Sequence, residues 1–167
     1  MEPGEALGTT VQVAVALAGF AGVVVVFRTE SVHQWSAVDK FRLRLLLGNS
    51  VIPLTFCLFG LLLLVFNPPP VGIWRWGSGF AALVLFPYGV LMGRSARSIP
   101  PGQFPSDPTT RLIFYPLFLS AWAFSFLQLF NLFFLGAFWP FFAVIVFQLF
   151  AAVIQFVRLI LLPHQSS

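Results

Sequence analysis

The longest uncharged run of this chain, residues 112–157, constrains its fold more than any other feature, because it contains no Asp, Glu, Lys or Arg. A helix crosses a bilayer with about 20 apolar residues, so this run is too long for one span and long enough for two. Gly136 and Pro140, in the segment LGAFWP, are residue types that form turns between helices. We therefore expect two membrane-spanning helices joined by a tight turn near residues 135–140.

The composition extends this expectation to the whole chain. Of its 167 residues, 59% are hydrophobic and 8% are charged, whereas soluble domains carry about 25% charged residues. A soluble fold of this length cannot bury so much apolar surface, so the expected partner of the chain is the lipid bilayer. The nine basic residues are spread thinly between apolar runs. That spacing is typical of topology determinants, and no nucleic-acid partner is expected.

We expect a single transmembrane domain, residues 1–167, which folds as an all-α helical bundle with five transmembrane helices. The expected spans are residues 9–27, 43–66, 73–92, 110–134 and 139–162. Three consecutive prolines at 68–70 end the second span, because proline cannot continue a helix. An alternative with four spans, in which one short run is re-entrant, stays open.

The distribution of basic residues favours five spans over four. With five spans, eight of the nine basic residues lie on one side of the membrane and only Arg75 lies on the other. The positive-inside rule then places the N-terminus outside and the C-terminus inside. The residues expected to contact lipid headgroups on the basic side are Arg28, Lys40, Arg42, Arg44, Arg94, Arg97 and Arg111.

Local signals mark the ends of the spans. Ser36 followed by Asp39 is typical of a capping box that opens the second helix. Asp107 before Pro108 is a favourable N-cap and first-turn pair for the fourth helix. The tryptophans expected at the membrane interfaces are Trp35, Trp74, Trp76 and Trp139.

The residue types that carry most membrane chemistry are missing from the expected spans. No Asp, Glu, His or Lys lies within them, and proton relays, carboxylate metal sites and intramembrane hydrolases depend on such groups. His33 and His164 lie outside the spans, and Cys57 is the single cysteine, which we interpret as a buried thiol. We therefore expect no enzyme, no catalytic residue, no metal site and no cofactor.

Neutral polar residues form stripes on the last two spans. Gln148 and Gln155 are seven positions apart and nearly superpose on a helix, as do Ser120 and Asn131 on the preceding span. Amides in lipid need hydrogen-bond partners, so the stripes either join neighbouring helices or line a polar path or ligand pocket. The predicted intramembrane polar residues are Asn49, Ser120, Gln128, Asn131, Gln148, Gln155 and Arg158.

Small residues form a second pattern, on the first span. Ala14, Ala18 and Gly22 recur every four residues, with Gly19 beside them. Such a ridge lets another helix backbone approach closely. The predicted partner is either a helix of the same chain or another copy of the protein.

Two stretches of the chain support a resemblance. The segment AGFAGVVVVFRTESVHQWSAVDKFRLRLLLGNS, residues 18–50, and the final helix WPFFAVIVFQLFAAVIQFVRLI, residues 139–160, resemble a group of small, uncharacterised multi-pass proteins of the prokaryotic inner membrane. The resemblance implies an inner (plasma) membrane location. It brings no known activity, cofactor or site residue.

The function expected from the sequence is non-catalytic: a small bundle that assembles as a homo-oligomer or joins a larger membrane complex. One alternative is a small channel or transporter for a neutral or anionic solute, lined by the amides of the last two spans. Another is a binder of lipid, isoprenoid or pigment, because 13 of the 22 phenylalanines lie within residues 112–157. Dry contacts around the amides would favour assembly, water a channel, and an aromatic groove open to the membrane a lipid binder.

Overall fold

The protein is a bundle of long helices in the computed structural model, which describes residues 2–27, 36–66, 70–99 and 108–161. The elements are α1 (Pro3–Phe27), α2 (Ala37–Val65), α3 (Pro70–Arg97), α4 (Pro108–Phe130), a π-helical continuation η2 (Asn131–Leu135) and α5 (Phe138–Leu161). Within these described ranges there is no β-strand. The five α-helices are each long and apolar enough to cross a membrane, so the prediction of five spanning helices is confirmed.

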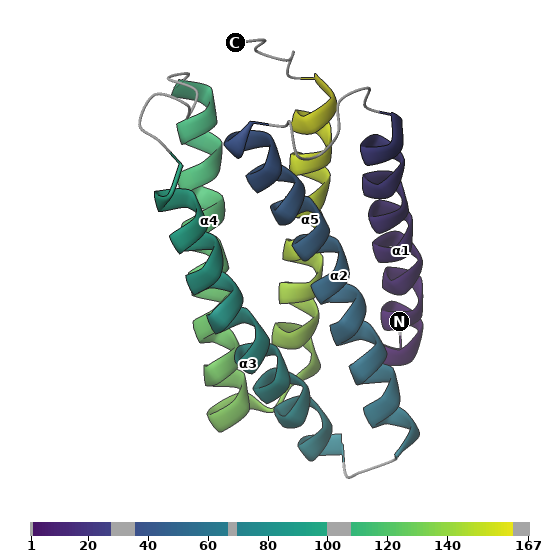
Figure 1. The fold of residues 1–167 in the computed structure, drawn as a ribbon. Helices are drawn as coiled ribbons and strands as arrows, with labels where there is room; N and C mark the ends of the chain where they lie inside the picture. Colours follow the sequence, from purple (N-terminus) through teal and green to yellow (C-terminus); the bar gives the residue numbers. More distant parts are fainter. Residues whose placement is uncertain (1, 28–35, 67–69, 100–107, 162–167) are drawn as a thin grey trace.

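The helices run alternately up and down, and α2 and α5 occupy the middle of the bundle (Figure 1). Helix α1 packs against one side of this central pair, while α3 and α4 pack against the other side. An odd number of spans puts the beginning of α1 and the end of α5 at opposite ends of the bundle. The first turns of α2 and the last turns of α3 and α5 therefore share one end, and this end carries Arg42, Arg44, Arg94, Arg97 and Arg158.

Local chemistry fixes the start of α2 and the turn before α5, as the sequence predicts. Ser36 is the N-cap of α2, and its Oγ accepts a hydrogen bond of 3.1 Å from the backbone N–H of Asp39. Helix α4 begins at Pro108, while its expected cap, Asp107, lies outside the described residues. Gly136 adopts a left-handed φ of 63°, which glycine tolerates without strain. The predicted turn between the last two spans is thus confirmed.

Close helix packing depends on two glycines that face one phenylalanine. Phe141 of α5 is fully buried between α2 and α3. A Cβ added at Gly60 would lie 3.2 Å from its ring, and one added at Gly77 would lie 3.3 Å from it. Both distances are shorter than ordinary van der Waals contact, so the absence of a side chain at these positions lets the ring fit.

One tryptophan expected at a membrane interface lies in the core. Trp74 is 8% exposed, and its ring centroid lies 4.6 Å from that of Phe138 on α5. It shares the inner face of α3 with Ser78 and Ala81, one and two turns further along the helix, which explains its burial. Trp76 and Trp139 are exposed, while Trp35 lies outside the described part of the chain.

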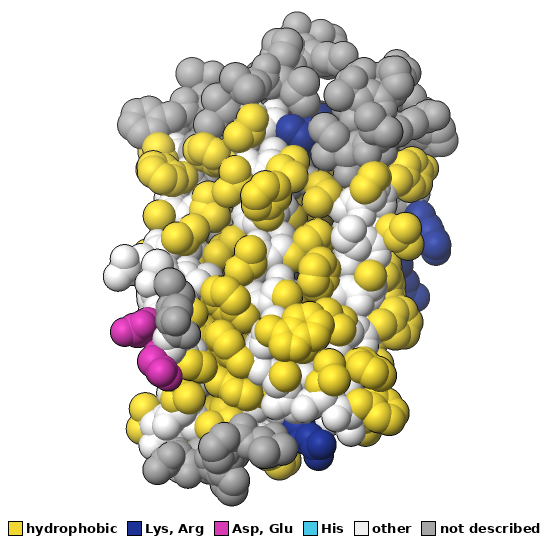
Figure 2. All heavy atoms as spheres, turned by 180° about the vertical axis from the view of Figure 1, so that it is seen from behind, with side chains coloured by type: hydrophobic (Ala, Val, Ile, Leu, Met, Phe, Trp, Pro, Cys, Tyr) yellow, Lys and Arg dark blue, Asp and Glu magenta, His cyan; other side chains and the backbone are white. Residues whose placement is uncertain are grey.

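The outer surface of the bundle is apolar, as expected for a lipid-facing protein. Figure 2 shows hydrophobic side chains over most of one face, between the two ends. On α1 the inward face is formed by Ala14, Leu17 and Ala21, which are buried. Gly19 and Gly22 lie on the exposed side of this helix, and nothing lies within 4 Å of a Cβ added at either.

Of the predicted small residues, Ala14 thus contacts helices of the same chain, whereas Gly19 and Gly22 do not. Ala18 is half-buried between these two faces. The alternative in which another copy of the protein packs on the outer face of α1 stays a prediction.

Candidate functional site

Polar side chains inside the bundle, most of them predicted, form two groups with different surroundings. The first group closes the turn between α4 and α5, and we call it the polar clasp: Ser78, Gln128 and Asn131, with the backbone of Ala137 and Pro140. The Oγ of Ser78 donates to Oε1 of Gln128 at 2.9 Å, and Nε2 of Gln128 donates to the carbonyl oxygen of Pro140 at 2.8 Å. All three side chains are fully buried. The clasp therefore joins α3, α4 and α5 through satisfied hydrogen bonds.

Asn131 imitates a backbone partner within the clasp. Its Nδ2 donates to the carbonyl oxygen of Ala137 at 2.9 Å, and its Oδ1 accepts from the N–H of Ala137 at 2.9 Å. The same Nδ2 also donates to Ser78 Oγ at 2.7 Å. Ala137 lies between η2 and α5, where backbone groups lack helical partners. One side chain thus satisfies the donor and acceptor of a residue outside both helices.

Sequence reasoning missed Ser78. Its signal is the tripeptide Gly77-Ser78-Gly79, a serine between two glycines inside a predicted span. A Cβ at Gly79 would lie 3.5 Å from Leu132, so the glycines bring the α3 backbone close to η2 and α5. At that distance a serine hydroxyl can reach the amides of the neighbouring helix.

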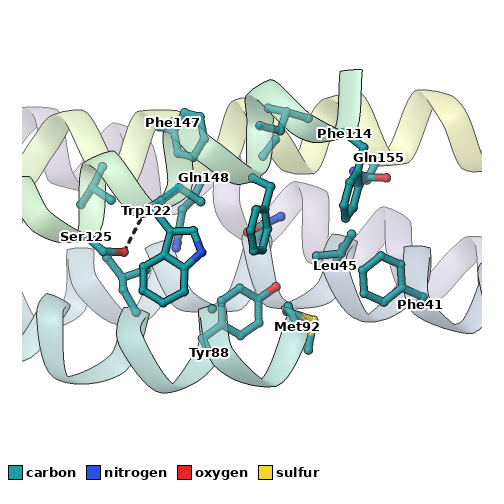
Figure 3. A pocket seen from close by; sticks show the side chains of 18 residues that line it. Phe41, Leu45, Tyr88, Met92, Phe114, Trp122, Ser125, Phe147, Gln148 and Gln155 are labelled. Carbon is teal, nitrogen blue, oxygen red and sulfur yellow. Dashed lines mark hydrogen bonds between the residues drawn. The ribbon is translucent and has the colours of Figure 1, made fainter. Parts of the chain in front are cut away.

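The second group lines a cavity of about 90 Å³ enclosed by α2, α3, α4 and α5. This aromatic cavity is partly open and mostly apolar. The side chains labelled around it in Figure 3 are Phe41, Leu45, Tyr88, Met92, Phe114, Trp122, Ser125, Phe147, Gln148 and Gln155. None of the described residues that line it is Asp, Glu, Lys, Arg or His. The cavity lies in the half of the bundle whose end carries the basic residues.

The packing of α4 explains why a cavity forms there. Between residues 114 and 124 no side chain of α4 is buried, whereas Ser125, Gln128 and Asn131 are. The polar clasp thus holds one end of α4 and η2 against the bundle, while the side chains of residues 114–124 are only half-buried or exposed. Ala121, which lines the cavity, is exposed on this half of α4.

Three polar atoms beside the cavity have no hydrogen-bond partner among the described residues. Gln148 is 4% exposed and Gln155 is 3% exposed, and the Oε1 atom of each is buried without a partner among the described residues. The buried hydroxyl oxygen of Tyr88 is likewise unpartnered within the described chain. Such an unsatisfied group costs about 1–3 kcal/mol in a folded protein. These atoms differ in this respect from the amides of the clasp, which are bonded.

The two glutamines lie at two levels along the bundle. Gln148 lies beside Trp122 and Gln155 lies near Phe114, while the hydroxyl of Tyr88 lies between these two positions (Figure 3). Seven helical residues separate the two glutamines, which corresponds to a rise of about 10.5 Å at 1.5 Å per residue. The cavity is thus elongated along the helices.

The α2 wall of the cavity is set by Gly48 and Asn49. A Cβ added at Gly48 would lie 2.7 Å from Cε2 of Tyr88, so only glycine leaves room for this ring. Asn49 is buried and lines the cavity. Residue 53 is proline, which has no N–H, so the backbone carbonyl of Asn49 lacks its usual helical donor. This part of α2 therefore adds polar character near Tyr88.

The remaining predicted residues lie around these two groups. Ser120 is half-buried and does not line the cavity, while Arg158 is half-buried in the last turn of α5, three residues beyond Gln155. Arg44, Arg94 and Arg97 are exposed.

Other residues named in the sequence analysis either contact neighbouring side chains or lie outside the part of the chain that the structure describes. Arg42 forms an ion pair of 3.5 Å with Asp39, and Lys40 is half-buried. Arg28, His33 and His164 lie outside the described residues, and the side chain of Arg111 is not described. Cys57 is fully buried and free, which confirms its interpretation as a buried thiol.

Comparison with known proteins adds no further assignment. The chain matches no family model, no curated protein and no solved structure. Within the described residues, no group of three His, Cys, Asp or Glu side chains could hold a metal ion. The fold and the site define a helical bundle with five candidate membrane-spanning helices and a cavity whose described lining residues carry no charge.

Proposed function

We propose that this chain is a non-catalytic multi-pass membrane protein that binds an apolar or amphipathic membrane molecule in the aromatic cavity. One observation carries the proposal: the buried amides of Gln148 and Gln155 present unpartnered oxygens beside a partly open, apolar space. Buried polar groups in proteins are nearly always hydrogen-bonded. A molecule bound in the cavity would supply the partners that the chain does not.

The lining of the cavity supports this proposal. Ligand sites are typically apolar and aromatic with a few convergent polar groups, and they lie between the helices of bundles. The cavity has this composition, with Trp122, Phe114 and Phe147 beside the two glutamines. The half of α4 beside the cavity has no buried side chain between residues 114 and 124, so in our proposal the ligand enters past this helix from the bilayer, where the described lining residues carry no charge.

The same geometry favours binding over conduction. A channel lined by all four amides needs Gln128 and Asn131 to face the same path as Gln148 and Gln155. Gln128 and Asn131 instead form hydrogen bonds within the clasp, and neither residue lines the cavity. The four amides therefore serve two purposes, turn closure and, in our proposal, ligand contact.

Self-assembly remains a second candidate, favoured by the outer face of α1. Gly19 and Gly22 are exposed there with open space above them, beside the exposed Phe20. Small residues let a second helix approach closely in a membrane, where packing drives association. A second copy could cover this face without altering the cavity, because α1 contributes no lining residue.

The proposed location is a prokaryotic inner membrane with the N-terminus outside. Supporting it, Arg42, Arg44, Arg94, Arg97 and Arg158 share one end of the bundle, which the positive-inside rule assigns to the cytoplasm. The cavity would then lie in the inner half of the membrane.

Native mass spectrometry of the protein released from mild detergent tests the proposal. We expect the wild-type chain to retain a small apolar molecule. Gly89 lines the cavity, so Gly89→Leu would fill it and abolish this adduct. Gly72→Leu is the matched control, because Gly72 lies outside the cavity with nothing within 4 Å of an added Cβ. An adduct that persists in Gly89→Leu would overturn the proposal, and the same spectra report the oligomeric state.

A further inference from the structure

The two levels of unpartnered amides carry an inference about the chemistry of the ligand, which rests on the proposed binding function. We infer that the ligand is an elongated, uncharged molecule that lies parallel to the helices and carries two hydrogen-bonding groups about 10 Å apart. One group would contact Gln148 and the other Gln155.

The lack of charge in the lining argues for a neutral ligand. The described lining residues include no Asp, Glu, Lys, Arg or His. A charged group placed among them would lose its hydration without gaining an opposite charge, which is strongly unfavourable in a membrane interior. A hydroxyl or an amide, in contrast, both donates and accepts hydrogen bonds and can be satisfied by a carboxamide. The polar groups of the ligand are therefore hydroxyl-like or amide-like.

The shape of the cavity argues for a single chain. Its lining extends along α5 from Val144 to Gln155. An extended polymethylene or prenyl chain can follow this lining and reach both glutamines, and because the cavity is partly open the chain need not be fully enclosed.

The spacing of the polar atoms argues for two contacts. Gln148 and Gln155 lie on the same face of α5, because seven residues nearly complete two turns. At a separation of about 10.5 Å, one hydroxyl cannot bond both amides. The hydroxyl of Tyr88 adds a third polar atom, which lies between the two glutamines along the bundle (Figure 3). Each of the two polar groups of the ligand thus has one glutamine as its partner.

A series of linear alkane diols tests this inference. Each diol carries a hydroxyl at either end, so chain length sets the distance between the two groups. The matched probes are the primary alcohol and the fatty acid of the same length, the latter at alkaline pH. Binding is followed by the saturable change in tryptophan fluorescence in detergent, and Trp122→Phe shows which part of the signal comes from the cavity.

We expect the diol whose hydroxyls lie about 10 Å apart to bind most tightly, about tenfold better than the primary alcohol. Gln148→Leu or Gln155→Leu should reduce its affinity to that of the alcohol. Gln12→Leu is the matched control, because Gln12 is exposed on α1 and the same substitution there leaves the cavity intact.

Each other result contradicts the inference in a recognisable way. Equal binding of diol and alcohol would show that the second hydrogen bond is absent, and preferential binding of the fatty acid would show that charge is accepted. In both cases the cavity still binds a chain, so the proposed function survives. If no probe binds saturably while native mass spectrometry shows an adduct sensitive to Gly89→Leu, the ligand class is wrong but the cavity is a site. If neither is observed, both proposals fail.

Discussion

Replacing Gln148 by leucine is expected to stabilise the ligand-free protein, although the substitution removes a buried polar residue from the middle of the bundle. The Gln148 side chain is 4% exposed, and its Oε1 has no partner among the described residues. Burial of an unpaired amide costs about 1–3 kcal/mol. Leucine is close to glutamine in size and carries no polar atom. The free energy of unfolding should therefore rise by about 1–2 kcal/mol.

The same substitution at Gln128 is expected to have the opposite sign. Gln128 accepts from Ser78 at 2.9 Å and donates to the carbonyl oxygen of Pro140 at 2.8 Å. Interhelical hydrogen bonds in membrane proteins contribute about 0.6–1.7 kcal/mol each, and two are lost. Gln128→Leu should therefore lower the free energy of unfolding by about 1–3 kcal/mol.

Reversible unfolding in mixed micelles, titrated with a denaturing detergent and followed by circular dichroism, measures both effects. Gln12→Leu on the exposed side of α1 is the control and should change stability by less than about 0.5 kcal/mol. If Gln148→Leu destabilises the protein as much as Gln128→Leu, the Gln148 amide is partnered in the folded chain. The distinction between clasp and cavity would then be refuted.

Three further substitutions test individual contacts by the same unfolding assay. Gly48→Ala places a Cβ 2.7 Å from Cε2 of Tyr88 and should lower the free energy of unfolding by about 1–3 kcal/mol. Gly72→Ala is the control, because nothing lies within 4 Å of a Cβ added there. Equal effects of the two substitutions would contradict the close contact between Gly48 and Tyr88. Tyr88→Phe removes an unpartnered hydroxyl and should leave stability unchanged or raised by up to about 1 kcal/mol, so a clear loss would indicate an existing hydrogen bond. Asn131→Ala leaves the N–H and carbonyl of Ala137 without their side-chain partners and should cost about 2–4 kcal/mol, and a cost below about 0.5 kcal/mol would show that the turn does not need the clasp.

The existence of the five helices, the start of α2 and the turn before α5 could be predicted because local chemistry determines them. A glycine in LGAFWP, a serine three residues before Asp39 and a proline at the start of α4 each act on their own backbone. Long apolar runs without charge likewise predict membrane spans from length alone. These signals depend on neighbours in the sequence, and the structure follows them.

The partners of the polar side chains could not be predicted in the same way. Gln128 and Gln148 are the same residue type on neighbouring helices, yet one is bonded within the clasp and the other faces the cavity. The difference depends on the rotation and the shift of each helix relative to α3. The residue pattern of a single helix does not predict these two quantities. The role of Ser78 could not be predicted for the same reason, because its hydrogen bond depends on how closely α3 approaches Asn131.

The small-residue pattern on α1 illustrates the same limit. A four-residue spacing of small residues predicts a face that permits close approach of another helix. It does not say which helix approaches, and the structure brings Ala14 to the bundle while Gly22 lies outward.

The measurement that tests the central claim most directly is an experimental structure of the protein in lipid, examined at the aromatic cavity. We expect elongated non-protein density between α4 and α5, with polar atoms within hydrogen-bond distance of the Gln148 and Gln155 amides. A closed bundle in which Ala121 of α4 packs directly on Ala151 of α5, with both amides bonded within the chain, would contradict the binding function proposed for this protein.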